Sequence, residues 1–66
     1  MIIRYKIEVE SEQEISVYTR RMSLFNTHYE SEEFALQDIE EFFREFPDAM
    51  LVLSIKKVYK NKREAF

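Results

Sequence analysis

Residues 31–47 read SEEFALQDIEEFFREFP, and this stretch decides the fold. At about 100° per residue, its apolar side chains gather into one stripe of a helix, made up of Ala35, Leu36, Ile39, Phe42, Phe43 and Phe46. Ser31 is a suitable N-cap, and the two acids that follow it suit the positive end of the helix dipole. Because the residue before Pro47 avoids the helical conformation, the sequence predicts a helix over residues 32–46.

The rest of this helix surface is acidic. Residues 30–48 hold eight carboxylates and one base, Arg44. One aromatic residue, Phe34, falls among these acids, roughly opposite the apolar stripe, and such an exposed ring is typical of a partner surface. The candidate partner-binding residues are therefore Glu33, Phe34, Asp38, Glu41 and Glu45. The alternative interpretation is that Phe34 folds back over the helix start and packs near Tyr29.

The N-terminal stretch has the alternation of a strand. Apolar side chains stand at every second position from Ile3 to Val9, which predicts a strand with one buried face. The alternation resumes at Ile15 after a polar break, so we interpret residues 2–21 as a β-hairpin whose second strand continues toward Tyr29 through a bulge. The chain has no glycine, which favours a longer loop over a tight two-residue turn.

The last apolar stretch, residues 50–60, reads MLVLSIKKVYK and predicts another strand. A right-handed crossover through the helix places this strand beside the first one. We therefore expect residues 1–66 to form a single α+β domain of order β-β-α-β. Its three-stranded antiparallel sheet has the order 2-1-3, and one helix packs on one face. Residues 61–66 are expected to be frayed.

The uncovered face of this sheet predicts a homodimer. A chain of 66 residues without cysteine buries only about 60% of its unfolded surface and lacks disulfides or a Cys/His metal cluster to support it. The expected dimer face consists of apolar residues turned away from the helix, Tyr18, Met50, Val52 and Val58. The alternative is that long Lys and Arg stems cover this face.

The sequence argues against several function classes. A lone histidine, His28, has no recognisable nucleophile or orienting partner, and phosphate-binding loops rich in glycine are impossible here. No EF-hand spacing appears. We therefore predict no enzymatic activity, no cofactor and no metal. No apolar run approaches the ~18 residues of a membrane span, and no signal-peptide pattern is visible, so we expect a cytoplasmic protein that does not bind membranes.

The C-terminal region is basic. Its bases are interleaved with Tyr59, a small version of a surface that tracks a phosphate backbone, and they are Lys56, Lys57, Lys60, Lys62 and Arg63. The net charge of −3 and the lack of a groove-reading motif argue against nucleic-acid binding as the main function. It is kept as the alternative function.

Several motifs resemble small proteins encoded by phages of Gram-positive bacteria. These motifs are Ser31-Glu-Glu-Phe-Ala, Ile39-Glu-Glu-Phe, Phe46-Pro-Asp-Ala and Leu53-Ser-Ile-Lys-Lys-Val-Tyr59. The expected strand and helix order is similar to that of the phage-encoded uracil-DNA glycosylase inhibitors, whose helix also opens with Ser, an acid and Phe. That family continues with an acid and, one turn on, a Tyr, where this chain has Ala35 and Asp38. The resemblance implies a small dimeric DNA mimic that occupies the DNA-binding cleft of an enzyme.

These observations together favour a small protein-binding module. The expected partner is a host protein, and the sharpest form of the hypothesis is a phage-type DNA-mimicking inhibitor of a DNA-processing enzyme such as uracil-DNA glycosylase. Charge complementarity would speed the encounter, and Phe34 would anchor the complex. A third interpretation is a structural or assembly subunit without an inhibitory role.

Overall fold

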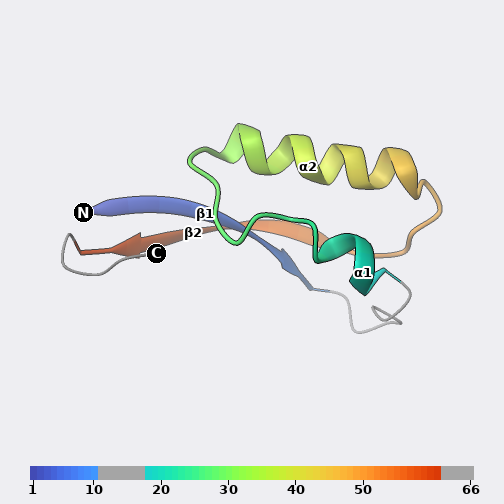
Figure 1. Ribbon diagram of the computed structural model, residues 1–66, viewed down its shortest axis with the longest axis horizontal. Helices are drawn as coiled ribbons and strands as arrows, with labels where there is room; N and C mark the ends of the chain where they lie inside the picture. The colour runs from blue at the N-terminus through green and yellow to red at the C-terminus, as the bar shows by residue number, and fades with distance from the viewer. Residues whose placement is uncertain (11–17, 62–66) are drawn as a thin grey trace.

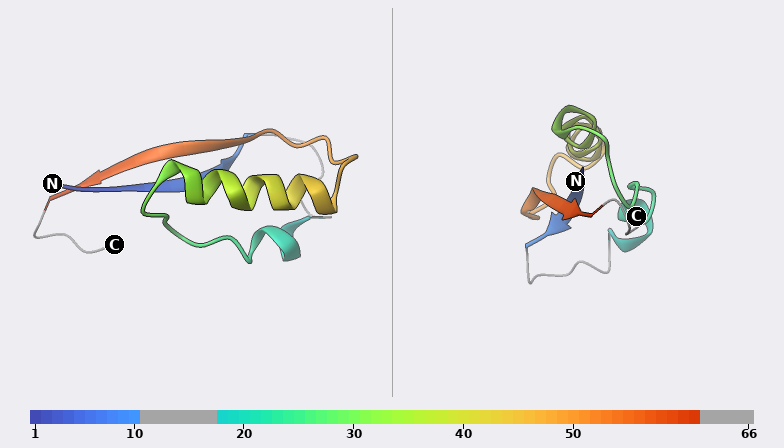
Figure 2. Two further views of the ribbon diagram at one scale, coloured as in Figure 1. Left: turned by 90° about the horizontal axis from the view of Figure 1, so that it is seen from above. Right: turned by 90° about the vertical axis from the view of Figure 1, so that its left-hand side faces the viewer.

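The computed structural model describes residues 1–10 and 18–61 of the chain. Its elements in chain order are β1 (Ile2–Val9), α1 (Thr19–Met22), α2 (Glu32–Glu45) and β2 (Leu53–Lys60). The two strands form one layer and α2 lies over one of its faces, while α1 lies on the β1 side of the sheet (Figures 1 and 2). The strands extend past the start of α2, so one end of the sheet is not covered by the helix (Figure 1).

The helix predicted from the sequence is confirmed to within one residue. The Ser31 side-chain oxygen accepts a hydrogen bond from the backbone N–H of Phe34 at 3.3 Å, as expected of an N-cap. Glu32 and Glu33 occupy the first turn, and Arg44 lies in the last turn, where a positive charge suits the helix dipole. The C-cap is Phe46, directly before Pro47.

The pairing of the first and last strands is also confirmed. β1 runs antiparallel to β2 from the pair Ile2–Lys60 to the pair Val9–Leu53. The Tyr29 side chain reaches α2, and because Tyr29 forms an antiparallel bridge with Tyr5, the Tyr5 side chain lies on the α2 side of the sheet. Alternation then places Leu53 and Ile55 on that side, as predicted, and Val52 and Val58 on the open face.

The predicted second strand is wrong as far as the structure describes it. Thr19–Met22 form a single turn of helix instead of the end of a hairpin, so the three-stranded sheet of order 2-1-3 is replaced by two antiparallel strands in a β-α-β arrangement. What connects residues 24–30 to the sheet is the bridge between Tyr5 and Tyr29, whose backbone N–H groups each donate to the other's carbonyl at 2.9 and 2.6 Å. Residues 11–17 of the predicted hairpin and residues 62–66 of the predicted frayed end lie outside the described residues.

Aromatic packing explains why helix forms around residue 20. Tyr18, Met22 and Phe25 are spaced as residues on one face of a helix. Parts of the same stretch also alternate as a strand would, so the sequence pattern fits both structures. The Tyr18 ring packs edge-on against the rings of Phe42 and Phe46, with centroids 5.8 and 5.3 Å apart. The Phe25 ring lies 6.0 Å from that of Phe42. The helical turn lets these rings pack against α2, and their burial stabilises that conformation. A third strand would hold the rings away from α2 and lose this packing.

The core is centred on the predicted apolar stripe of α2. The buried residues come from α2 and from the segments on either side of it, and they are Tyr29, Ala35, Ile39, Phe42 and Leu51. Phe43 and Phe46 are half-buried, but the prediction is wrong for Leu36, which is 47% exposed. Leu36 lies at the margin of the stripe, and a sheet of two strands is too narrow to cover the full width that three strands would have covered.

Candidate functional site

Four of the predicted partner-binding residues share one flank of α2. Phe34, Asp38, Glu41 and Glu45 follow one another at helical spacing, and we call this set the acidic flank. It faces α1 and residues 24–30, which run beside β1 (Figure 2). The fifth predicted residue, Glu33, lies in the first turn of the helix and is exposed. The structure therefore brings four of the five predicted residues together on one side of the helix.

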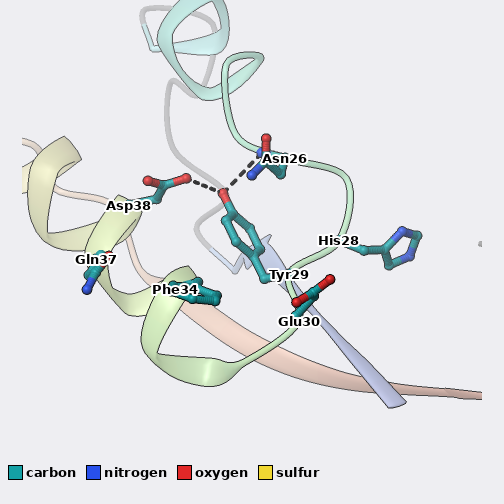
Figure 3. A pocket seen from close by; sticks show the side chains of 7 residues that line it. All are labelled: Asn26, His28, Tyr29, Glu30, Phe34, Gln37 and Asp38. Carbon is teal, nitrogen blue, oxygen red and sulfur yellow. Dashed lines mark hydrogen bonds between the residues drawn. The ribbon is translucent and has the colours of Figure 1, made fainter. Parts of the chain in front are cut away.

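Two carboxylates of the acidic flank bind other parts of the chain. The Glu45 carboxylate accepts a hydrogen bond from Nε of Arg21 in α1 at 2.7 Å. The Asp38 carboxylate accepts one from the Tyr29 hydroxyl at 2.5 Å, and that hydroxyl in turn accepts one from the backbone N–H of Asn26 at 3.0 Å (Figure 3). These contacts hold α1 and the loop before α2 against the helix.

Tyr29 connects β1, the loop before α2 and α2 itself, through its bonds to Tyr5, Asn26 and Asp38. The sequence did not predict this role. The Tyr29 side chain is 5% exposed, and burial raises the pKa of Tyr29 from 10.0 to about 12, with a further contribution from the hydrogen bond to Asp38. The phenol therefore stays neutral over the physiological pH range and donates a hydrogen bond to the Asp38 carboxylate. A tyrosine at the end of a polar loop was a weak signal, because nothing in the sequence pairs it with a carboxylate nine residues away.

A shallow cavity of about 330 Å³ opens between the acidic flank and the loop. Seven residues line it, and Figure 3 shows their side chains: Asn26, His28, Tyr29, Glu30, Phe34, Gln37 and Asp38. Phe34 is 53% exposed, so it lines the same cavity as Tyr29 without being buried against it. Phe34 is thus exposed, as predicted. The alternative, in which the ring packs over the helix start near Tyr29, stays a prediction that Phe34→Ala tests.

The open face of the sheet collects positive charge. The register sets Lys60 opposite Ile2, Val58 opposite Arg4 and Lys56 opposite Lys6. Arg4, Lys6, Lys56 and Lys60 thus share one face, which we call the basic face. Glu8 lies among them, with its Oε1 atom 3.2 Å from the Nζ atom of Lys6 and 3.7 Å from that of Lys56. The basic face therefore keeps a net positive charge.

The remaining predicted bases are placed differently. Lys57 faces the α2 side, where its Nζ atom lies 5.9 Å from the ring centroid of Tyr5 and 5.8 Å from that of Tyr59. Lys62 and Arg63 lie outside the described residues. The sequence itself predicts that Arg4, Lys6 and Arg20 extend this basic surface across the open face of the sheet. The strand pairing places Arg4 and Lys6 there, whereas Arg20 lies in α1.

The residues of the predicted dimer face lie in different places. Val52 is 56% exposed and its carbonyl accepts from the Glu10 N–H, and it lies on the open side of the sheet together with the half-buried Val58. Met50 is 82% exposed but precedes β2, so strand alternation does not assign it to a face. Tyr18 does not belong to this face. Its ring packs against Phe42 and Phe46 under α2, because the chain around it is helical and carries the side chain into the aromatic cluster.

The site offers little catalytic chemistry in the part of the chain that the structure describes. No group of three or more His, Cys, Asp or Glu residues within residues 1–10 and 18–61 could hold a metal ion. His28 lines the cavity, but its ring turns away from the Tyr29–Asp38 pair (Figure 3). None of the helices in these same ranges is long and apolar enough to cross a membrane.

No family model, curated protein or solved structure matches this chain. The resemblance to the phage-encoded inhibitors thus rests on the short sequence motifs given above.

Proposed function

We propose that this protein is a small non-enzymatic module that binds another protein through the acidic flank of α2. The observation that carries the proposal is the exposure of Phe34, 53% of whose side chain is open to solvent at the rim of a cavity. Aromatic rings at the centre of a contact surface often supply a large share of the binding energy. A helix that only had to fold would gain little from an aromatic ring at this position.

The surroundings of Phe34 define the chemistry of the partner. Glu33 and Glu41 are exposed, and Asp38 is held at the cavity by Tyr29, so the ring is surrounded by negative charge. A partner with a basic and partly apolar groove would match both features. The DNA-binding cleft of a DNA-processing enzyme is a surface of this kind, so a DNA-mimicking inhibitor is the sharpest form of the proposal.

The first prediction is that Phe34→Ala weakens partner binding by at least about 2 kcal/mol, or roughly 30-fold. The melting temperature should change little, because the ring is exposed and alanine favours helix. The measurement is calorimetric titration against a protein captured by the full chain from a bacterial lysate. Leu36→Ala is the matched control, because Leu36 is comparably exposed on the other flank of the same helix. It should leave the affinity unchanged.

Charge reversal adds a second readout to this experiment. Glu41→Lys should slow association, and the effect should shrink as salt is added, because the exposed carboxylate acts over a distance that salt screens. The proposal fails if Phe34→Ala clearly lowers stability while the folded fraction binds the partner as tightly as the parent protein. That result would make Phe34 part of the core.

The basic face supports nucleic-acid binding as a second candidate function. The observation in its favour is the register, which sets Arg4 and Lys6 beside Lys56 and Lys60 on one open face. In this case Phe34→Ala would have no effect on a titration with a single-stranded oligonucleotide. Lys56→Gln would instead weaken binding. It would also reduce the slope of the logarithm of the binding constant against the logarithm of salt concentration by about one, because one fewer counterion is released. The two candidates thus give opposite results for the same pair of variants.

A second prediction concerns self-association. We expect the protein to dimerise at tens of micromolar through the open face, where Val52 is exposed. Val52→Lys should weaken the dimer without loss of the core, since Val52 is 56% exposed, whereas Leu36→Lys on the opposite layer should not. Light scattering measures the mass of each variant in solution. A monomer in the unmodified protein at that concentration rules out the dimer.

A further inference from the structure

β2 has an outer edge with backbone groups that the described chain leaves unpaired. Tyr5 uses its N–H and C=O groups on Tyr29, so in the pair Tyr5–Lys57 the backbone groups point away from each other. By alternation, the outward N–H and C=O groups of β2 belong to Leu53, Ile55, Lys57 and Tyr59. The sheet has two strands in the described residues, and none of their helices or strands lies beside this edge (Figure 2).

The other edge of the sheet is blocked at its centre. Tyr29 bridges Tyr5 of β1, and α1 and residues 24–30 run on that side (Figure 2). A strand that joins the sheet along its full length would therefore have to join at β2. Unpaired edges of this kind are sites where an extended segment can add as a further strand, because main-chain hydrogen bonds supply the affinity.

The charge of β2 selects among possible occupants. Leu53–Lys60 carry three lysines and no acid. In an antiparallel pairing of two copies at this edge, outward residues must stand opposite outward residues. The two registers that use most of the strand therefore set Lys56 opposite Lys56 or Lys57 opposite Lys57 of the other copy, and like charges in this position are destabilising. Lysines on an edge strand are a common protection against such self-pairing. The same lysines would attract a strand of opposite charge.

We propose that the outer edge of β2 binds an extended acidic segment of another protein, which adds to the sheet as a third strand. Side chains of that segment would alternate between the two faces. Apolar side chains would lie on the α2 side next to Leu53 and Ile55, and acidic side chains would lie on the open face next to Lys56 and Lys60. This surface is on the side of the sheet away from the acidic flank, so the inference stands apart from the proposed function.

The test uses the full chain and a capped eight-residue peptide of alternating glutamate and valine. Amide hydrogen exchange is followed by NMR with and without the peptide. At a peptide concentration about ten times Kd, the outward N–H groups of Ile55 and Lys57 should exchange about tenfold more slowly. The N–H groups of Lys56 and Val58 already bond to β1, so their exchange should change far less. A matched peptide with lysine in place of glutamate should not bind.

Two substitutions in β2 separate the backbone from the charge. Lys57→Pro removes an outward N–H and no bond to β1, so it should abolish peptide binding while circular dichroism shows the fold retained. Lys56→Gln keeps every N–H of β2 and removes a charge of the open face, so it should weaken binding several-fold at low salt and little at high salt. If the proline variant does not fold, the glutamine variant and the exchange pattern still decide the question.

Three results would overturn the proposal. The first is peptide binding that leaves the exchange of the Ile55 and Lys57 amides unchanged. The second is protection of those amides without peptide that rises with protein concentration, because this would assign the edge to a second copy of the chain. The third is no peptide binding together with tight binding of a single-stranded oligonucleotide, which would assign the lysines to phosphate groups.

Discussion

Phe42→Ala is expected to abolish the cooperative unfolding of this protein. Phe42 is fully buried, and its ring contacts more aromatic rings than any other in the described structure, with Tyr18, Phe25, Phe43 and Phe46 at centroid distances of 5.3 to 6.0 Å. The substitution leaves a cavity between α2 and the segment around α1. Removing a buried Phe side chain costs about 3–5 kcal/mol.

That loss is comparable to the whole free energy of unfolding. At about 0.05–0.15 kcal/mol per residue, a domain of this size has a stability of roughly 3–10 kcal/mol. Thermal melting followed by circular dichroism should therefore show a broad transition or none. Leu36→Ala on the same helix is the control, with an expected change below about 1 kcal/mol because Leu36 is half exposed. A melting temperature of Phe42→Ala within a few degrees of the parent would show that the aromatic cluster is not the core.

Tyr29→Phe is expected to destabilise the protein by about 1.5–3 kcal/mol. The substitution keeps the ring and removes only the hydroxyl, which donates to the charged Asp38 carboxylate and accepts from the backbone N–H of Asn26. The chain before α2 then loses its side-chain attachment to the helix. Urea unfolding of both proteins measures the difference. Tyr59→Phe is the matched control, because Tyr59 is exposed and should tolerate the change.

The contribution of Tyr29 should disappear at high pH. Its pKa in the folded protein is about 12, above the ordinary value of 10.0, so the unfolded chain loses the phenol proton first as the pH rises. Ionisation therefore favours unfolding. The stability difference between the parent and Tyr29→Phe should be complete below pH 10 and should be lost as the pH rises through about 12. A difference that stays constant from pH 8 to pH 12 would show that the hydroxyl is not buried in the folded state.

Asp38→Asn tests the acceptor of the same hydrogen bond. The amide oxygen can still accept from the Tyr29 hydroxyl, but the negative charge is gone. We expect a smaller loss of stability than in Tyr29→Phe and a lower pKa for Tyr29, since Asp38 contributes to raising it. Absorbance of the ionised phenol over a pH titration reports that pKa directly.

Helix α2 and the two strands were predictable from the sequence because neighbouring residues in each of them indicate the same structure. For α2, the apolar stripe, the N-cap at Ser31 and the proline at position 47 all indicate the same helix. Because a helix has a fixed period, its start and its stripe also determine that Phe34 points away from the core. The faces of β1 and β2 follow in the same way from the period of two.

The conformation of residues 18–29 follows from packing between segments. Their apolar residues fit a strand pattern and a helical pattern, so local sequence does not choose between them. The choice depends on Tyr18 and Phe25 meeting Phe42, a contact that exists only after α2 has packed. The same holds for the hydrogen bond between Tyr29 and Asp38 and for Arg20, which the sequence predicts on the basic face and which lies in α1. Both positions depend on packing between segments that are not adjacent in the sequence.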